Sequence, residues 1–366
     1  SMIRISESKK HVYIDISIDE GNKYTFGESK LSGKYENVPE VLLQVQIGTI
    51  PGQVFSRSEV TATTARLNQI LGDYGYAFSN ANAIPDVNKK ERTVAFNYFI
   101  DPGKKIYVRR INFFGNEKTK DSVIRRQMRQ FESSWYSKRK VDRSKQRLSQ
   151  TQYFDSIDLQ ITNVPGVTDQ VDVNIQVAER NTGKVMVGAG VSSNEGLVGT
   201  FTLSQSNFLG TGNTVTTSVS TGEVNKTYAL SYQDPYWTDD GVSRTFGAYR
   251  RDVNTSDLST ASYNTFSYGT NIDFRVPLTE YNSVSFGATL DLTDIELGAN
   301  ATQEYIDYCR NVSGSITTND CNSDSISINA GYGADTRDNA QFPTKGQVFS
   351  VGAQIGLPVF DMNYYT

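Results

Sequence analysis

The chain has 366 residues, more than one ordinary domain needs, so we expect two or three hydrophobic cores. Its hydrophobic content is 37%, its mean hydropathy is -0.45, and no run of about 18 apolar residues occurs, which excludes a transmembrane helix. Strands of a transmembrane β-barrel alternate apolar and polar side chains, so their mean hydropathy is close to zero and composition alone leaves a barrel open.

The charged side chains divide the sequence into a basic half and an acidic half. Residues 1–180 carry 27 basic and 21 acidic side chains, whereas residues 181–366 carry 9 and 19. The stretch from Lys104 to Arg147 alone holds 15 basic and 4 acidic side chains. This excess favours contact with an anionic membrane surface or an acidic partner, although a solvated helical face would account for it equally well.

The start of the sequence and its two cysteines give indirect information on location. The chain shows no signal peptide, and Ser1-Met2 has the character of a cloning remnant before an interior start. Cys309 and Cys321 flank a polar loop. A disulfide between them would staple this loop in an oxidising compartment, and free thiols are the alternative.

Three strand-like segments repeat with a period of about 80 residues. Val12–Gly21, Thr93–Gly103 and Val171–Gly183 each alternate apolar and polar residues and reach a turn that contains glycine. After each of the first two turns we predict another strand, over Tyr24–Gly33 and then over Tyr107–Gly115.

Two helical stretches follow in each repeat. In the first, Val60, Thr64, Leu67, Leu71 and Tyr74 recur at a spacing of three and four, which predicts one stripe of an amphipathic helix. In the second, residues 121–130 and 138–152 are predicted to be helical, and each module therefore has the order β-α-α-β-β. Aromatic residues end the second helical stretch of each module, at residues 74–76 and 153–154, and we expect them to pack on the sheet.

The second half of the chain predicts a meander of nine strands. They lie at residues 184–192, 197–205, 213–222, 227–233, 243–252, 262–276, 283–297, 323–336 and 347–358. In the first of them Val185, Val187, Ala189 and Val191 share one face, and several strands approach the roughly 9 to 11 residues needed to cross a bilayer. A soluble β-sandwich would show the same alternation, but aromatic residues near strand ends, such as Trp237, favour a membrane barrel with interfacial girdles.

Several short motifs follow one another in this arrangement. They are Gly115-Asn116, Arg125–Gln130 (RRQMRQ), Val164-Pro165-Gly166, Glu179–Gly183 (ERNTG), Leu209–Gly212 (LGTG), Asp234–Trp237 (DPYW) and Phe342–Gly346 (FPTKG). In this order they resemble the BamA family of outer-membrane β-barrel assembly factors, in which tandem periplasmic POTRA modules precede a transmembrane barrel. The resemblance covers essentially residues 11–366.

The resemblance implies a fold class and a domain order. The fold class is α+β POTRA modules of β-α-α-β-β order followed by an antiparallel transmembrane β-barrel, truncated here because only nine strands are predicted. The expected domains are a tag remnant with the last strand of a preceding module (1–21), a module that resembles the fourth of the family (22–102), one that resembles the fifth (103–180), and the N-terminal part of the barrel (181–366).

A location and a function also follow from the resemblance. We expect a protein of the bacterial outer membrane, with its POTRA modules in the periplasm and lipid around its barrel. Its activity would be the assembly and insertion of β-barrel proteins, with unfolded outer-membrane proteins as clients. The first barrel strand would then be a lateral gate, formed by Gly183, Lys184, Val185, Met186, Val187, Gly188, Ala189, Gly190 and Val191. Gly188 and Gly190 would weaken this strand, although a tight bend of the barrel wall would also account for them.

The modules would serve as binding sites. Their sheets could add a client strand by β-augmentation, and an accessory lipoprotein such as BamD could dock at Arg125, Arg126 and Arg129 on the first helix of the fifth module. An ordinary solvated helix face would explain these arginines as well. Aromatic residues are not interleaved with the basic ones, as a groove for single-stranded nucleic acid would need, so no nucleic-acid partner is expected.

Other functions fit the sequence less well. The chain holds one histidine, His11, and no motif for a metal, a nucleophile or a phosphate loop, so we expect no enzyme, no metal and no cofactor. The nearest alternative within the same superfamily is a TamA-like protein or a two-partner secretion pore, because these also combine POTRA modules with a barrel. A passive porin or an adhesin would not need tandem α/β modules before its barrel.

Overall fold

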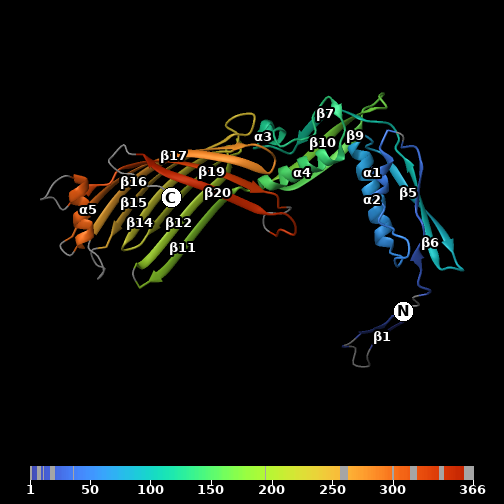
Figure 1. The fold of residues 1–366 in the computed structure, drawn as a ribbon, viewed down its shortest axis with the longest axis horizontal. Helices are drawn as coiled ribbons and strands as arrows, with labels where there is room; N and C mark the ends of the chain where they lie inside the picture. Colours follow the sequence, from blue (N-terminus) through green and yellow to red (C-terminus); the bar gives the residue numbers. More distant parts are fainter. Residues whose placement is uncertain are drawn as a thin grey trace. The chain divides into compact units, whose positions relative to one another are not determined.

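The computed structural model describes residues 2–5, 10, 12–16, 21–35, 37–193, 195–255, 263–298, 301–313, 320–337 and 342–357 (Figure 1). The chain forms two compact units. The first comprises residues 1–114, 127–150 and 157–176, and the second comprises residues 115–126, 151–156 and 177–366. Among the described residues, none of the helices combines the length and the apolar character that a membrane crossing requires.

A short two-stranded sheet and a first α+β module begin the chain. β1 (Met2–Ile5) pairs with β2 (Val12–Asp15), and the module that follows has the predicted β-α-α-β-β order except that its predicted first strand is divided into two. Its elements are β3 (Thr25–Phe26), β4 (Lys30–Gly33), α1 (Glu40–Gln44), α2 (Arg57–Asp73), β5 (Asn80–Asn88) and β6 (Thr93–Asp101). β6 lies in the middle of the sheet, parallel to β3 and β4 and antiparallel to β5, and both helices run along this sheet in Figure 1.

The core of this module follows from the alternation along β6. Every second residue of this strand is buried, and these side chains join Leu67 and Leu71 of α2 in one hydrophobic cluster. The predicted helical stripe is correct at these two leucines but wrong at Tyr74, which is exposed. The helix ends at Asp73 and Gly75 adopts a φ of +102°, so that Tyr76 is buried instead and its hydroxyl accepts a hydrogen bond from Asn37 Nδ2 at 3.0 Å.

The second module also has a mixed sheet. Its elements are β7 (Tyr107–Phe114), α3 (Asp121–Arg125), β8 (Ser134–Trp135), α4 (Lys138–Thr151), β9 (Phe154–Asn163) and β10 (Gln170–Glu179). The strand order is β8-β7-β10-β9, and β10 runs parallel to β7. Asp73 Oδ1, at the end of α2, accepts a hydrogen bond from the backbone N–H of Arg139 at 2.6 Å, so the first module supplies a carboxylate to the first turn of α4.

The first helix of the second module is shorter than the sequence predicts. α3 ends at Arg125, whereas residues 121–130 were expected to be helical. The physical reason is competition for backbone donors, because Ser144 Oγ of α4 accepts the N–H of Arg129 at 2.8 Å. The buried side chain of Gln130 then holds the following loop, accepting the N–H of Ser137 at 2.9 Å and donating to the carbonyl of Trp135 at 3.0 Å.

A buried tyrosine of this loop gives the second module a pH dependence. Tyr136 is 4% exposed, and burial raises the pKa of its phenol from 10.0 to about 12. The phenol keeps its proton to a higher pH in the folded state than in the unfolded state, where its pKa is 10.0. This difference contributes about 2–3 kcal/mol to the free energy of unfolding below pH 10, and the contribution is lost as the pH rises to 12. We expect the alkaline unfolding followed by near-UV circular dichroism to be shallower in Tyr136→Phe. If alkaline unfolding had the same pH dependence in the wild type and in Tyr136→Phe, Tyr136 would not be the source of this effect.

The rest of the chain forms one large antiparallel sheet in meander order. Its strands are β11 (Gly183–Ser192), β12 (Gly196–Phe208), β13 (Asn213–Thr221), β14 (Asn225–Asp234), β15 (Ser243–Asn254), β16 (Tyr263–Pro277), β17 (Asn282–Leu297), β19 (Ser325–Asp335) and β20 (Val348–Leu357). Figure 1 shows them side by side. The nine predicted strands are therefore confirmed, with bounds that shift by up to three residues. We call the end of the sheet at which β11 begins the near end, and the opposite end the far end.

The register of the sheet gives it two chemically different faces. Across one face Val187 pairs with Phe201, Phe201 with Val219 and Val219 with Tyr228, and similar pairs continue to β20, where Ile328 faces Ile355. Across the other face lie mostly small or polar side chains, as where Thr202 pairs with Ser218. Such a two-faced sheet buries its apolar side in lipid and leaves its polar side to water.

At the far end the chain departs from the predicted meander. Between β17 and β19 it forms a helix, α5 (Gln303–Ser313), and a short strand, β18 (Asp320–Asn322), that pairs with β17. The sequence predicts only a polar loop between the two cysteines. The helix covers a small buried cluster of Ile295, Leu297 and the two cysteines.

Candidate functional site

The predicted gate strand forms one edge of the large sheet. All ten residues of β11 pair with β12, from Gly183 opposite Gln205 to Ser192 opposite Gly196, and among the described residues β11 has no second neighbour. Its apolar side chains are exposed: Val187 is 77% and Val191 87% accessible. An edge strand presents a row of backbone groups that can pair with another strand.

The two glycines of β11 have different surroundings. A Cβ at Gly188 would lie 2.6 Å from Thr200 Oγ1, whereas a Cβ at Gly190 would meet nothing within 4 Å. Neither has a positive φ, so the backbone does not bend here in a way that only glycine allows. Gly188 is explained by its neighbour on β12, and Gly190 leaves a gap in the packing of the strand.

Beside the start of β11, a turn of the sheet is bound to the loop before α3. Residues 209–212 connect β12 to β13 at the near end, and Asn207 lies just before them at the end of β12. Within the second unit, Lys120 donates its backbone N–H to the carbonyl of Gly210 at 2.9 Å, and Asn207 Nδ2 donates to Thr119 Oγ1 at 2.7 Å. Gly210 has a φ of +71°, and a Cβ there would lie 1.8 Å from the carbonyl oxygen of Lys118. Only glycine fits this approach.

A cation and two tyrosines extend this contact. The guanidinium of Arg126 lies 4.3 Å from the centre of the Tyr236 ring, and Tyr153 donates its hydroxyl to the carbonyl of Gly212 at 3.0 Å. Burial lowers the pKa of Arg126, and the nearby Tyr236, Tyr153 and Asp234 oppose part of this effect. An arginine desolvated against an aromatic ring makes a stronger cation–π contact than an exposed one. Tyr153 and Phe154 were expected only to pack on the sheet. For Tyr153 this prediction was incomplete, because its hydroxyl also binds the turn at Gly212.

A carboxylate fixes the same loop from the other side. Glu179, the last residue of β10, accepts the backbone N–H of Thr119 at 2.6 Å and that of Lys118 at 3.0 Å. Burial alone would raise the pKa of Glu179, but these hydrogen bonds outweigh it and lower the pKa. We call this set of contacts the junction; it comprises Lys118, Thr119, Lys120, Arg126, Tyr153, Glu179, Asn207, residues 210–212 and Tyr236.

The three arginines predicted to dock a partner differ in their surroundings. Arg125 is exposed on α3 and forms an ion pair with Asp121 at 3.2 Å. Arg126 belongs to the junction. Arg129 is half-buried and lies beyond the end of the helix. The prediction that all three lie on this helix is therefore wrong, because α3 ends at Arg125.

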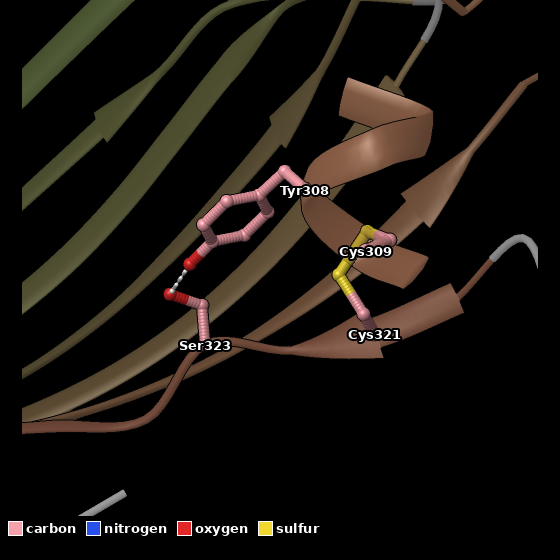
Figure 2. The surroundings of a disulfide bond; sticks show 4 residues. All are labelled: Tyr308, Cys309, Cys321 and Ser323. Atoms are coloured by element: carbon pink, nitrogen blue, oxygen red, sulfur yellow. Dashed lines mark hydrogen bonds between the residues drawn. A yellow bond between two sulfur atoms is a disulfide. The ribbon is translucent and has the colours of Figure 1, made fainter. Parts of the chain in front are cut away.

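The two cysteines form a disulfide at the far end. Cys309 of α5 and Cys321 of β18 have an S–S distance of 2.03 Å and a Cα–Cα distance of 5.1 Å, and both are buried (Figure 2). Tyr308 and Ser323 share a hydrogen bond of 2.9 Å between their hydroxyls next to it. We call α5, β18 and this bond the cap.

The described residues offer no evident centre for metal chemistry. Within the ranges that the structure describes, no group of three or more His, Cys, Asp or Glu side chains could hold a metal ion. His11 lies outside the described residues.

Comparisons with known proteins agree with this architecture. A model of POTRA, described as surface antigen variable number repeat, matches residues 24–103 and 106–180, and the Omp85 superfamily domain matches residues 207–366. The chain is 33% identical over its whole length to the outer membrane protein assembly factor BamA of Neisseria meningitidis serogroup B, and 27% identical over 77% of its length to that of Buchnera aphidicola. The chain is BamA-like.

A solved structure supports this likeness in three dimensions. The crystal structure of BamA from Haemophilus ducreyi lacking POTRA domains 1–3 has a TM-score of 0.75 and 29% identity to the BamA-like chain, covering 92% of it and 64% of the solved chain. The chain spans about half the length of the curated BamA relatives, 46% of the Neisseria protein and 45% of the Buchnera protein.

The likeness also fixes the orientation in the cell. The protein belongs to the outer membrane, with its POTRA modules in the periplasm. Since β11 follows the second module after only three residues, the near end of the sheet is the periplasmic end and the cap lies at the extracellular end. The apolar face of the sheet is its lipid face.

Proposed function

We propose that this protein assists the insertion of β-barrel proteins into the outer membrane by offering the outer edge of β11 to strands of its clients. Unpaired backbone groups cost several kcal/mol each in hydrocarbon, so a client strand needs hydrogen-bonding partners before it enters the membrane. The observation that carries the proposal is an edge of ten residues that is paired on one side only within the described part of the chain. The mechanism requires pairing and no bond-making chemistry.

The composition of β11 supports exchange of partners at this edge. Its lipid-face side chains are small and apolar, so they place few specific demands on the strand that joins them. The gap at Gly190 reduces the side-chain packing that would hold a permanent neighbour. Backbone hydrogen bonds dominate such a contact, and sequence-tolerant binding of many clients follows from this.

We also propose that the second POTRA sheet receives client segments by β-augmentation. Among the described residues, the long edge strands of the two modules are β5 and β9, whereas the other edge strands, β3, β4 and β8, have only two to four residues. Pro85 lies within β5 and cannot donate to an added strand, whereas β9 has ten residues and no proline. The second module is therefore the better acceptor of a client strand.

An accessory lipoprotein of the BamD type is proposed to dock at α3. Arg125 is the exposed member of the three predicted arginines, and its ion pair with Asp121 is a surface pair between residues four apart. Such surface ion pairs contribute little to the free energy of unfolding. An acidic group of a partner can therefore replace Asp121 beside Arg125 at little cost. Arg126 is left out of this surface because its guanidinium is in the junction.

Site-specific photocrosslinking in cells tests the edge. A photoreactive residue at Val187 of the full-length protein should capture strands of several different clients during their assembly. Leu230 is the matched control, since it lies on the same face but in β14, which is paired on both sides. If a functional protein with the crosslinker at Val187 captured only segments of itself, or if Leu230 captured clients equally, the edge would not be the client site.

A further inference from the structure

The lipid face carries two arginines on one strand that differ in their partners. Arg244 and Arg250 are both on β15, six residues apart, so both side chains lie on the same face of the sheet. Their cross-strand neighbours include Phe274 and Tyr268, which continue the apolar face described above. Arg244 lies at the periplasmic end of this face, and Arg250 towards the extracellular end.

Arg250 has a counter-ion within the chain. Its Nε and Nη2 donate to the two carboxylate oxygens of Asp252 at 2.9 and 3.0 Å, and its guanidinium lies 5.5 Å from the centre of the Tyr268 ring. Its charge is therefore neutralised locally. No external anion is needed to explain this arginine.

Arg244 has aromatic contacts but no counter-ion. Its guanidinium lies 4.9 Å from the centre of the Phe246 ring and 5.1 Å from that of Trp237. Within the part of the chain that the structure describes, Arg244 has no ion pair, and its Nε is buried without a hydrogen-bond acceptor. Asp234, directly opposite on β14, accepts the backbone N–H of Tyr236 with its Oδ1 at 3.1 Å, and among the described residues it forms no ion pair with Arg244.

The surroundings of Arg244 are those of a membrane interface. Trp237 packs on Phe274 with ring centres 5.3 Å apart, and Phe274 stacks on Phe286 at 5.4 Å, so an aromatic girdle runs from the connection between β14 and β15 onto β16 and β17. Aromatic girdles mark the depth of the headgroups in barrels. A guanidinium at this depth, stacked on aromatic rings and with free donors, is suited to bidentate recognition of a phosphate.

We propose that Arg244, with Trp237 and Phe246, forms a binding site for the phosphodiester of an anionic phospholipid in the periplasmic leaflet. The aromatic rings hold the guanidinium flat against the lipid face while the phosphate accepts its donors. Charge complementarity selects an anionic headgroup over a zwitterionic one. The site is independent of the templating edge, which lies on another strand.

Native mass spectrometry of lipids retained by the full-length protein tests this site. After incubation in nanodiscs with equal amounts of phosphatidylglycerol and phosphatidylethanolamine, the wild-type protein should retain phosphatidylglycerol with about fivefold preference, the size expected for one basic side chain at an anionic surface. Arg244→Gln should lose this preference. Arg250→Gln, the matched control on the same strand and face, should keep it.

A second variant and a soluble anion complete the test. Arg244→Lys keeps the charge but lacks the planar fork, so it should keep the preference for phosphatidylglycerol while retaining less than half as much of this lipid as the wild type. The proposal is overturned if a folded Arg244→Gln keeps the wild-type preference, if Arg244→Lys retains as much phosphatidylglycerol as the wild type, or if Arg250→Gln loses the preference to the same extent as Arg244→Gln. It is also overturned if inorganic phosphate removes the wild-type preference, because the ligand would then be a soluble anion.

Discussion

Gly210→Ala will open the junction and, under the proposed function, strongly reduce the assembly of client proteins. The added Cβ would lie 1.8 Å from the carbonyl oxygen of Lys118, so the turn must move away and lose the hydrogen bond from Lys120. With the cost of placing alanine at a φ of +71°, we expect the junction to lose about 2–4 kcal/mol. Hydrogen exchange of the Lys120 amide should accelerate by about tenfold or more, and client assembly in cells should fall with it.

The matched control for this change is Gly166→Ala. Gly166 lies in the turn between β9 and β10 and has a φ of +79°, but a Cβ there would meet nothing within 4 Å. It therefore pays the same backbone cost as Gly210→Ala without any clash. If the two variants had equal effects on exchange at Lys120 and on assembly, backbone strain alone would be responsible and the contact with Lys118 would carry no function.

The large sheet was predictable from sequence because the pattern that defines each strand lies within the strand itself. Each strand must put one set of side chains in lipid and the other in water, so the alternation of residue types is visible along every strand. The same argument explains why α5 was missed. It lies at the extracellular end, outside the alternating pattern, and it is held by a small cluster with Ile295 and Leu297 of a neighbouring strand.

The end of α3 was missed for a different reason. The run Arg125–Gln130 contains residues that tolerate a helix well, and propensity alone extends the helix through it. What ends the helix is Ser144, which lies on α4 and takes the backbone donor of Arg129. A contact between residues fifteen apart in sequence cannot be inferred from the local pattern, and the placement of Arg126 and Arg129 on this helix was wrong for the same reason.

The junction was only partly visible in the sequence. The motif Leu209–Gly212 indicated a turn, since its glycines favour positive φ. Nothing in the motif indicates that this turn binds the loop before α3. Thr119, Asn207 and Glu179 are ordinary polar residues when considered singly. They become a site because β10 ends beside the loop that precedes α3, and this juxtaposition exists only in the folded chain.

Replacing both cysteines by serine, Cys309→Ser with Cys321→Ser, will release the cap at the extracellular end. The bond closes a loop with a sequence separation of 12 residues, and constraining a loop of this size in the unfolded state contributes about 3 kcal/mol. The serines also place two polar groups in a buried apolar cluster. Local opening of α5 should therefore become about a hundredfold more frequent.

Surface trypsin on intact cells measures this opening, because Arg310 is an exposed cleavage site on α5 and helical backbone resists proteases until it unfolds. The double-serine variant should be cut at Arg310, and adding Arg310→Gln should abolish this cut. Tyr308→Phe is the control for a milder change in the cap, since it removes the hydrogen bond to Ser323, worth about 1 kcal/mol, and leaves the disulfide in place. Equal cleavage rates in the wild type and the double-serine variant would show that the apolar cluster alone holds the cap, and that the disulfide does not govern its stability.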